Sequence, residues 1–98
     1  MRDITLPLDK LPRIINELLR AQPSSVRLEV GKHGGMVAIF LNEDPHMGVY
    51  LESPTTPEHV LDIVRPSVPK NYVVQPTILR YRDLNISYFT ILRKQDPR

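Results

Sequence analysis

The first part of the chain carries a helical pattern of apolar positions. Leucine and isoleucine recur every three or four residues from Leu11 to Leu19, and charged or amide side chains fill the positions between them. This spacing is typical of an amphipathic helix that packs one face on a core. Asp9 can cap the first free N–H groups, Pro12 falls in the first turn where its missing donor does no harm, and Gln22 with the proline after it ends the helix.

After this helix, apolar residues recur at every second position. Residues 26–30 alternate between apolar and polar side chains, which predicts a strand with one wet face. Residues 36–42 are apolar without alternation, as in a strand that is covered on both faces. A turn at Asp44 and Pro45 follows, and alternation returns over residues 47–51. We therefore expect three consecutive strands in a meander.

The last third of the chain begins with a second, shorter helix. Thr56 is a suitable N-cap, Pro57 suits the first helical position, and an apolar stripe over residues 60–64 predicts about two helical turns. Three prolines over residues 66–76 indicate an extended connection that can join a sheet only at an edge or with a break. Residues 77–94 then read as a β-hairpin.

These elements predict a single α+β domain spanning residues 1–98. We expect the order helix, three strands, helix, two strands, in which an antiparallel sheet of about five strands carries both helices on one face. Residues 3–8 can add an edge strand. A length of 98 residues suits one domain with one hydrophobic core.

Composition places the chain among ordinary globular proteins, since 41% of its residues are hydrophobic and 24% are charged. No apolar run approaches the roughly 18 residues of a membrane helix, and the N-terminus lacks the apolar stretch of a signal peptide, so we expect a cytoplasmic protein. The absence of cysteine excludes disulfides and thiolate chemistry. The net charge is only +2, but residues 66–98 carry six basic groups against two acidic ones.

The glycine cluster in "GKHGGMVAIF", residues 31–40, is the first candidate for chemistry. A phosphate-binding loop would place its glycines before a helix, whose N-terminus meets the phosphate. Here a strand follows the glycines. We therefore expect a hairpin turn, in which His33-Gly34 or Gly34-Gly35 adopts the positive φ angles that a two-residue turn requires.

Other catalytic and metal sites find little support. His33, His46 and His59 are thirteen residues apart, and the first two fall in consecutive turns, at opposite ends of strands about 20 Å long. No serine lies in a G-x-S-x-G motif, and the carboxylates of Glu43 and Asp44 are expected on a wet turn, where neither pKa would be raised. We expect no catalytic residue, no metal site and no cofactor.

The C-terminal hairpin carries the strongest positive signal. A two-residue turn at Asp83-Leu84 would place Arg82 opposite Asn85 and separate two faces. One face, expected to be the core face, gathers Thr77, Leu79, Tyr81, Ile86, Tyr88, Thr90 and Leu92. The other face gathers apolar side chains among arginines, a composition that interface cores favour. We call this set the hairpin patch: Ile78, Arg80, Arg82, Phe89, Ile91 and Arg93.

Three interpretations of the hairpin patch are open. The N-terminal segment or the 66–76 connection can cover its apolar residues. Alternatively, the patch or a nearby strand edge can bind a protein partner, including a second copy of the chain. In the third interpretation, arginines contact the phosphates of a nucleic acid while Phe89 or Tyr72 stacks on a base, but the low net charge disfavours it. We favour a non-catalytic protein-interaction module, acting as an adaptor, inhibitor or regulatory subunit.

Overall fold

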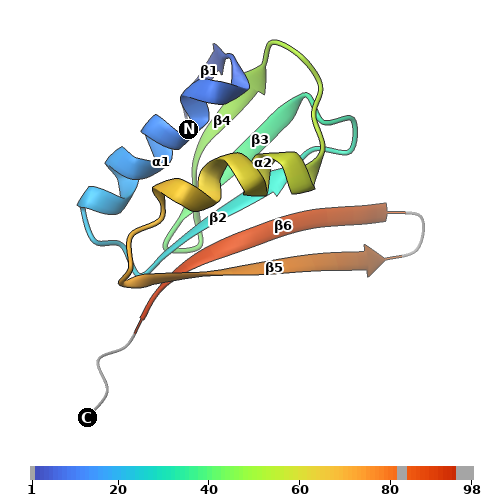
Figure 1. Cartoon of the computed structure of the whole chain (residues 1–98). Helices are drawn as coiled ribbons and strands as arrows, with labels where there is room; N and C mark the ends of the chain where they lie inside the picture. Colours follow the sequence, from blue (N-terminus) through green and yellow to red (C-terminus); the bar gives the residue numbers. More distant parts are fainter. Residues whose placement is uncertain (1, 82–83, 95–98) are drawn as a thin grey trace.

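The chain forms two layers, with two helices on one side of a mixed six-stranded sheet (Figure 1). The computed structural model describes the backbone of residues 2–81 and 84–94, and the side chains of residues 3–76 and 88–94. Within these residues the elements are β1 (Arg2–Leu6), the 3-10 turn η1 (Leu8–Lys10), α1 (Leu11–Arg20), β2 (Ser25–Val30), β3 (Met36–Leu41), β4 (Asp44–Leu51), α2 (Pro57–Val64), the 3-10 turn η2 (Arg65–Ser67), β5 (Tyr72–Tyr81) and β6 (Leu84–Arg93).

The strand order is β1-β4-β3-β2-β6-β5, so β1 and β5 form the two edges. β1 runs parallel to β4, with Ile4 opposite Val49, whereas the other neighbouring strands are antiparallel. The expectation of about five antiparallel strands is therefore corrected to six strands in a mixed sheet. A five-residue strand ending before Pro7 contains too few positions for its pairing direction to be read from apolar spacing.

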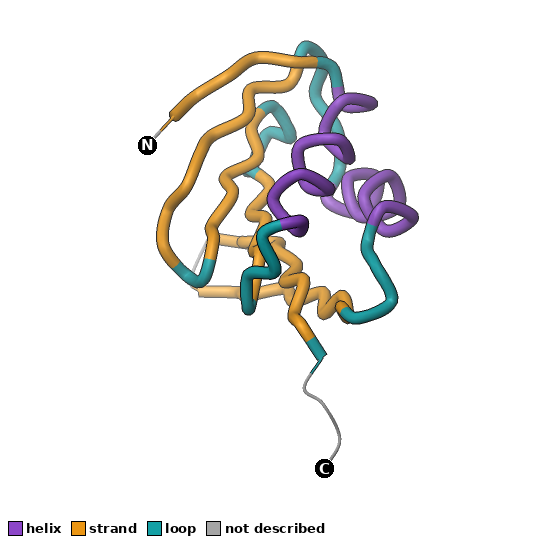
Figure 2. Tube along the Cα trace, turned by 90° about the vertical axis from the view of Figure 1, so that its left-hand side faces the viewer, coloured by secondary structure: helices purple, strands orange, loops and turns teal. Residues whose placement is uncertain are grey.

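Both helices form close to where the apolar pattern predicts them. Leu11, Ile15 and Leu19 are the buried residues of α1, and Val60 and Val64 are those of α2. Figure 2 shows the two helices together on one side of the strands. Neither helix in the described part of the chain is long and apolar enough to cross a membrane.

The two helix starts differ in how they are capped. The Thr56 hydroxyl accepts a hydrogen bond from the His59 backbone N–H at 3.2 Å, and Pro57 is the first residue of α2, as expected. At α1, by contrast, Asp9 lies within η1 and the N-cap residue Lys10 makes no side-chain cap. The expected Asp9 cap is therefore wrong, because a 3-10 turn leads directly into α1.

The turns around β3 differ in detail from those expected. β3 and β4 are joined by Asn42 and Glu43, both at positive φ (50° and 72°), instead of by a turn at Asp44-Pro45. Positive φ at both positions is the geometry of a two-residue type I′ turn. The glycine segment joins β2 to β3 over residues 31–35, with positive φ at Gly34. A turn between strands is therefore confirmed, but the expected two-residue turn is wrong, because five residues join the strands and neither His33 nor Gly35 has positive φ.

Pro76 lies inside β5, where the position of its backbone explains why it is tolerated. The Lys94 N–H donates to the Asn71 carbonyl at 2.7 Å. Because antiparallel strands alternate the direction of their N–H groups, the even-numbered residues of β5 direct theirs away from β6, toward the free edge. Pro76 therefore removes no bond of the ladder, which agrees with the prediction that this segment can join a sheet only at an edge.

Candidate functional site

The register of the C-terminal hairpin decides which side chains share a face. Arg80 is opposite Asn85, whereas the expected register placed Arg82 there, so the pairing is shifted by two residues. A shift by two keeps each residue on its own side of the sheet, because side chains alternate with a period of two. The expected grouping into two faces is therefore retained, and only burial can show which face the helices cover.

Burial shows that the helices cover the face of Phe89 and Ile91. These side chains are 2% and 0% exposed, and they lie opposite Leu28 and Val26 of β2, which are also buried. α2 contacts β6 directly, so a helix lies over this strand, and Val68 of the 66–76 connection packs against the same core cluster. The assignment of Phe89 and Ile91 to an exposed hairpin patch is therefore corrected: both belong to the core.

The other members of the hairpin patch fall into two groups. Ile78, Arg80 and Arg82 lie outside the residues whose side chains the structure describes. Arg93 is exposed, and its Nη1 donates to the backbone carbonyl of Gln22 at 2.7 Å. Arg93 therefore has a structural role, in which it holds the end of β6 to the connection between α1 and β2.

Tyr72 strengthens the same junction from the start of β5. Its hydroxyl donates to the Pro23 carbonyl at 2.6 Å, and its side chain is 4% exposed. Burial raises the pKa of the Tyr72 phenol above its ordinary value of 10.0, while the positive charge of Arg93 acts in the opposite direction. Since Tyr72 and Phe89 are both buried, neither can stack on a nucleic-acid base as the third interpretation requires.

Replacing Tyr72 with phenylalanine is expected to lower the free energy of unfolding by about 1–2 kcal/mol at neutral pH, because the Pro23 carbonyl loses its donor. The raised pKa stabilises the wild type below about pH 10, and this contribution is lost as the pH rises, since the unfolded state then releases the proton more readily. Urea unfolding at several pH values from neutral to alkaline should show that the free energy of unfolding falls less for the variant than for the wild type. Tyr50→Phe, at an exposed position, is the control, and an equal effect of both variants would contradict the prediction.

The histidines do not converge on a metal site. His33, His46 and His59 are all exposed. Within the part of the chain that the structure describes, no group of three or more histidine and carboxylate side chains could hold a metal ion. Glu43 and Asp44 are exposed at the turn between β3 and β4.

The face of the sheet away from the helices is the alternative candidate surface. Figure 2 shows the helices on one side of the strands only, and no helix of the described residues covers the other side. Two large hydrophobic side chains of this face are well exposed, Tyr50 (45%) and Val73 (40%). We call it the open face; by strand alternation its described residues are Asp3, Thr5, Ser25, Arg27, Glu29, Met36, Ala38, Phe40, Pro45, Gly48, Tyr50, Val73, Gln75, Tyr88, Thr90 and Leu92.

Arg27 lies near the middle of the open face, on β2. Its guanidinium carbon is 4.2 Å from the centre of the Phe40 ring and 5.7 Å from that of Tyr88, distances at which a cation is attracted to an aromatic ring. Its Nε lies 3.4 Å from Glu29 Oε1 but is buried without a hydrogen-bond partner among the described groups. Two strands adjacent to β2 thus hold this guanidinium in place, one from each side.

Small residues separate the aromatic positions on the open face. Gly48 of β4 lies beside Ala38 of β3, which lies beside Glu29 of β2. The Asp3 carboxylate extends over Gly48, where a Cβ atom would be 2.7 Å from its Oδ1. The described charges of this face are therefore two carboxylates and one guanidinium, a net charge of −1.

Sequence reasoning had identified Arg27 and Glu29 only as the wet side of a strand. It placed Phe40 in a strand covered on both faces, but Met36, Ala38 and Phe40 are only partly buried. The alternation of Val37 and Ile39 with these residues was hidden because both sets are apolar. The signal that could have shown the open face is the prediction that both helices lie on one face of the sheet, which leaves the other face without a helix.

The open face offers ring surfaces, one guanidinium and two carboxylates, on a rigid sheet. Such groups can bind apolar, planar or charged side chains of another molecule. Comparison with known proteins adds no assignment to this chemistry: no protein-family model, curated protein or solved structure matches the chain.

Proposed function

We propose that this protein is a non-catalytic protein-interaction module, an adaptor, inhibitor or regulatory subunit, which binds its protein partner through the open face. The observation that carries the proposal is the position of Arg27, stacked on Phe40 and close to Tyr88 on the helix-free side of the sheet. Arginine and tyrosine, together with tryptophan, are enriched at the energetic centres of protein interfaces. Tyr50, 45% exposed, adds a second aromatic anchor.

The order of these side chains favours binding. A long side chain normally loses conformational freedom when a partner immobilises it, which weakens association by about 0.5–1.5 kcal/mol per side chain. Arg27 has already lost much of this freedom through Phe40, Tyr88 and Glu29. A partner that covers it therefore gains the contact at a lower entropic cost.

Nucleic acid fits the open face less well than protein does. Phosphate groups require an excess of positive charge, whereas the described charges here sum to −1. Tyr72 and Phe89 are also buried, so their rings are not available to stack on bases. The experiment must therefore distinguish a nucleic-acid partner from a protein partner.

Photocrosslinking in the source cells tests the proposal. A photoreactive benzoylphenylalanine at position 50 should crosslink a protein partner, and the same residue at the exposed position 58 on α2 should not. Arg27→Ala should reduce the yield from position 50 by about tenfold or more, since loss of an interface hot spot costs about 2 kcal/mol or more.

Two controls separate binding from folding. Lys70→Ala, at an exposed position outside the open face, should leave the yield unchanged, and circular dichroism should show that Arg27→Ala remains folded. Adducts that disappear on nuclease treatment, or an equal yield from positions 50 and 58, would contradict the proposal.

A further inference from the structure

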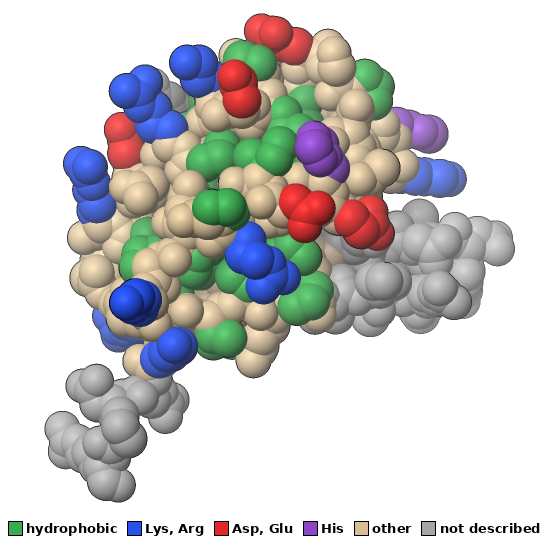
Figure 3. All heavy atoms as spheres, viewed as in Figure 1, with side chains coloured by type: hydrophobic (Ala, Val, Ile, Leu, Met, Phe, Trp, Pro, Cys, Tyr) green, Lys and Arg blue, Asp and Glu red, His purple; other side chains and the backbone are tan. Residues whose placement is uncertain are grey.

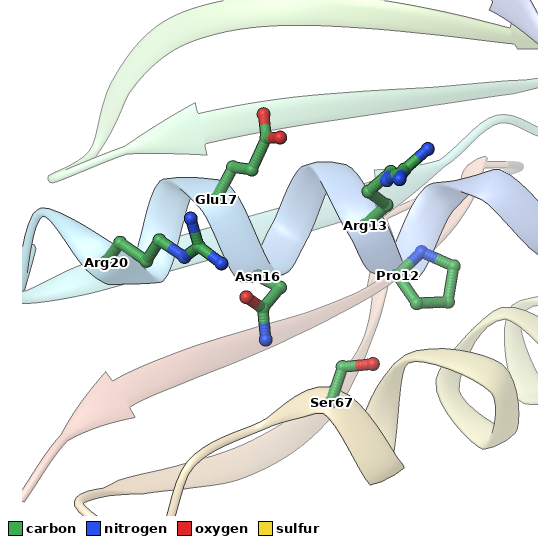
Figure 4. A pocket seen from close by; sticks show the side chains of 6 residues that line it. All are labelled: Pro12, Arg13, Asn16, Glu17, Arg20 and Ser67. Atoms are coloured by element: carbon green, nitrogen blue, oxygen red, sulfur yellow. The ribbon is translucent and has the colours of Figure 1, made fainter.

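The helical side of the molecule carries a polar hollow between α1 and η2. Its volume is about 420 Å³, and its lining residues are Pro12, Arg13, Asn16, Glu17, Arg20 and Ser67 (Figure 4). On this side of the molecule, basic and acidic side chains lie among stretches of apolar surface (Figure 3). The hollow is therefore a separate feature from the open face, which lies on the other side of the sheet.

The hollow follows from the amphipathic pattern of α1. Arg13, Asn16 and Arg20 are spaced by three and four residues, so they form one stripe on the side of the helix away from the buried leucines and isoleucine. Ser67 ends η2 and supplies the opposite wall. In Figure 4 the Asn16 amide points toward Ser67 and the Arg20 guanidinium turns toward Asn16. The Glu17 carboxylate points away from Ser67.

These polar groups are not used in holding the fold together. The side chains of Arg20, Asn16 and Ser67 make no hydrogen bond or ion pair with other residues that the structure describes. A guanidinium, an amide and a hydroxyl can each donate hydrogen bonds. Three kinds of donor near one another favour an anionic ligand, and two arginines against one glutamate leave the lining with a charge of +1.

The two walls of the hollow are connected beyond its end. Asn71 Nδ2 donates to Gln22 Oε1 at 2.9 Å, which ties the segment after η2 to the residues after α1. The Tyr72 hydroxyl donates to the Pro23 carbonyl in the same junction. Because these bonds fix the spacing of α1 and η2, the hollow is formed before any ligand binds, as is usual for ligand sites.

We propose that this hollow binds a phosphate group, held by the donors of Arg20, Asn16 and Ser67 with Arg13 at its rim. Arginine matches phosphate oxygens with paired hydrogen bonds. A volume of about 420 Å³ accommodates a phosphate together with part of the molecule that bears it. The bearer is either a small phosphate ester or a phosphorylated side chain of a protein, and both present the same group.

Titration with inorganic phosphate at constant ionic strength, followed by ¹⁵N-resolved NMR, tests the proposal. The expected result is a saturable set of shifts at α1 and Ser67. Arg20→Gln should weaken binding about tenfold or more, because a hydrogen bond to a charged group contributes about 1.5–3 kcal/mol. Glu17→Gln should tighten binding, since it removes the negative charge from the lining. The exposed Lys70→Gln loses the same charge outside the hollow and should leave binding unchanged.

A phosphoserine peptide in a second titration distinguishes the two sources. Tighter binding of the peptide than of inorganic phosphate supports a phosphorylated protein, and equal binding supports a small ester. Shifts scattered over the surface, or equal losses from Arg20→Gln and Lys70→Gln, would overturn the proposal, because phosphate would then be screening charge only.

Discussion

Phe89→Ala is expected to lower the free energy of unfolding by about 3–5 kcal/mol, as for other large aromatic side chains removed from a core. The Phe89 side chain is 2% exposed within the cluster that joins both helices to the sheet. Its removal leaves a cavity that neighbours such as Leu28, on the adjacent strand, can fill only in part. Urea unfolding monitored by circular dichroism gives the change directly.

Thr90→Ala is the matched control for this prediction. Thr90 is the next residue of β6, lies on the open face and is only partly buried, so its replacement should cost under about 1 kcal/mol. If the two variants were equally stable, the Phe89 side chain would be exposed after all, and the hairpin patch would again be a candidate surface.

Gly34→Ala is expected to destabilise the protein by about 2–4 kcal/mol, through two effects that act together. Gly34 has φ of +72°, which a residue with a Cβ atom adopts only with strain. A Cβ atom there would also overlap the Thr55 carbonyl oxygen and lie 2.8 Å from the Thr55 nitrogen. Since Thr55 N–H donates to the Gly34 carbonyl at 2.9 Å, the strand connection and the segment before α2 would have to separate.

Gly35→Ala provides a control one residue away. Nothing lies within 4 Å of the Cβ position at Gly35, so this variant should change stability by at most about 0.5 kcal/mol. Thermal unfolding of the two variants under identical conditions gives the comparison. Equal melting temperatures would show that the contact between Gly34 and Thr55 is not needed for the native structure.

Much of the fold could be predicted from local chemistry. The spacing of Leu11, Ile15 and Leu19 determines which side of α1 is buried, and Thr56 followed by Pro57 determines where α2 begins. The parallel pairing of β1 could not be predicted, because it depends on where the chain returns after α1 and not on the five residues of the strand. The two-residue register shift of the hairpin could not be predicted either, because side chains keep the same faces in both registers.

The candidate site, like the fold, could be predicted from the sequence only in part. Strand alternation correctly grouped Phe89 with Ile91 and separated both from Tyr88 and Thr90, but it assigned the two groups to the wrong sides. A single strand contains no information on which of its faces meets the helices when both faces carry apolar side chains. The stacking of Arg27 on Phe40 likewise depends on two strands meeting in register.

By itself, the sequence determined the positions of both helices and the two faces of each strand in which apolar and polar residues alternate, because these features depend on residues close together in the chain. Only the tertiary structure decided which face the helices cover, and therefore which side chains are core and which are free to bind. That choice depends on the total apolar area that α1, α2 and all six strands bury together, a quantity that no single segment specifies.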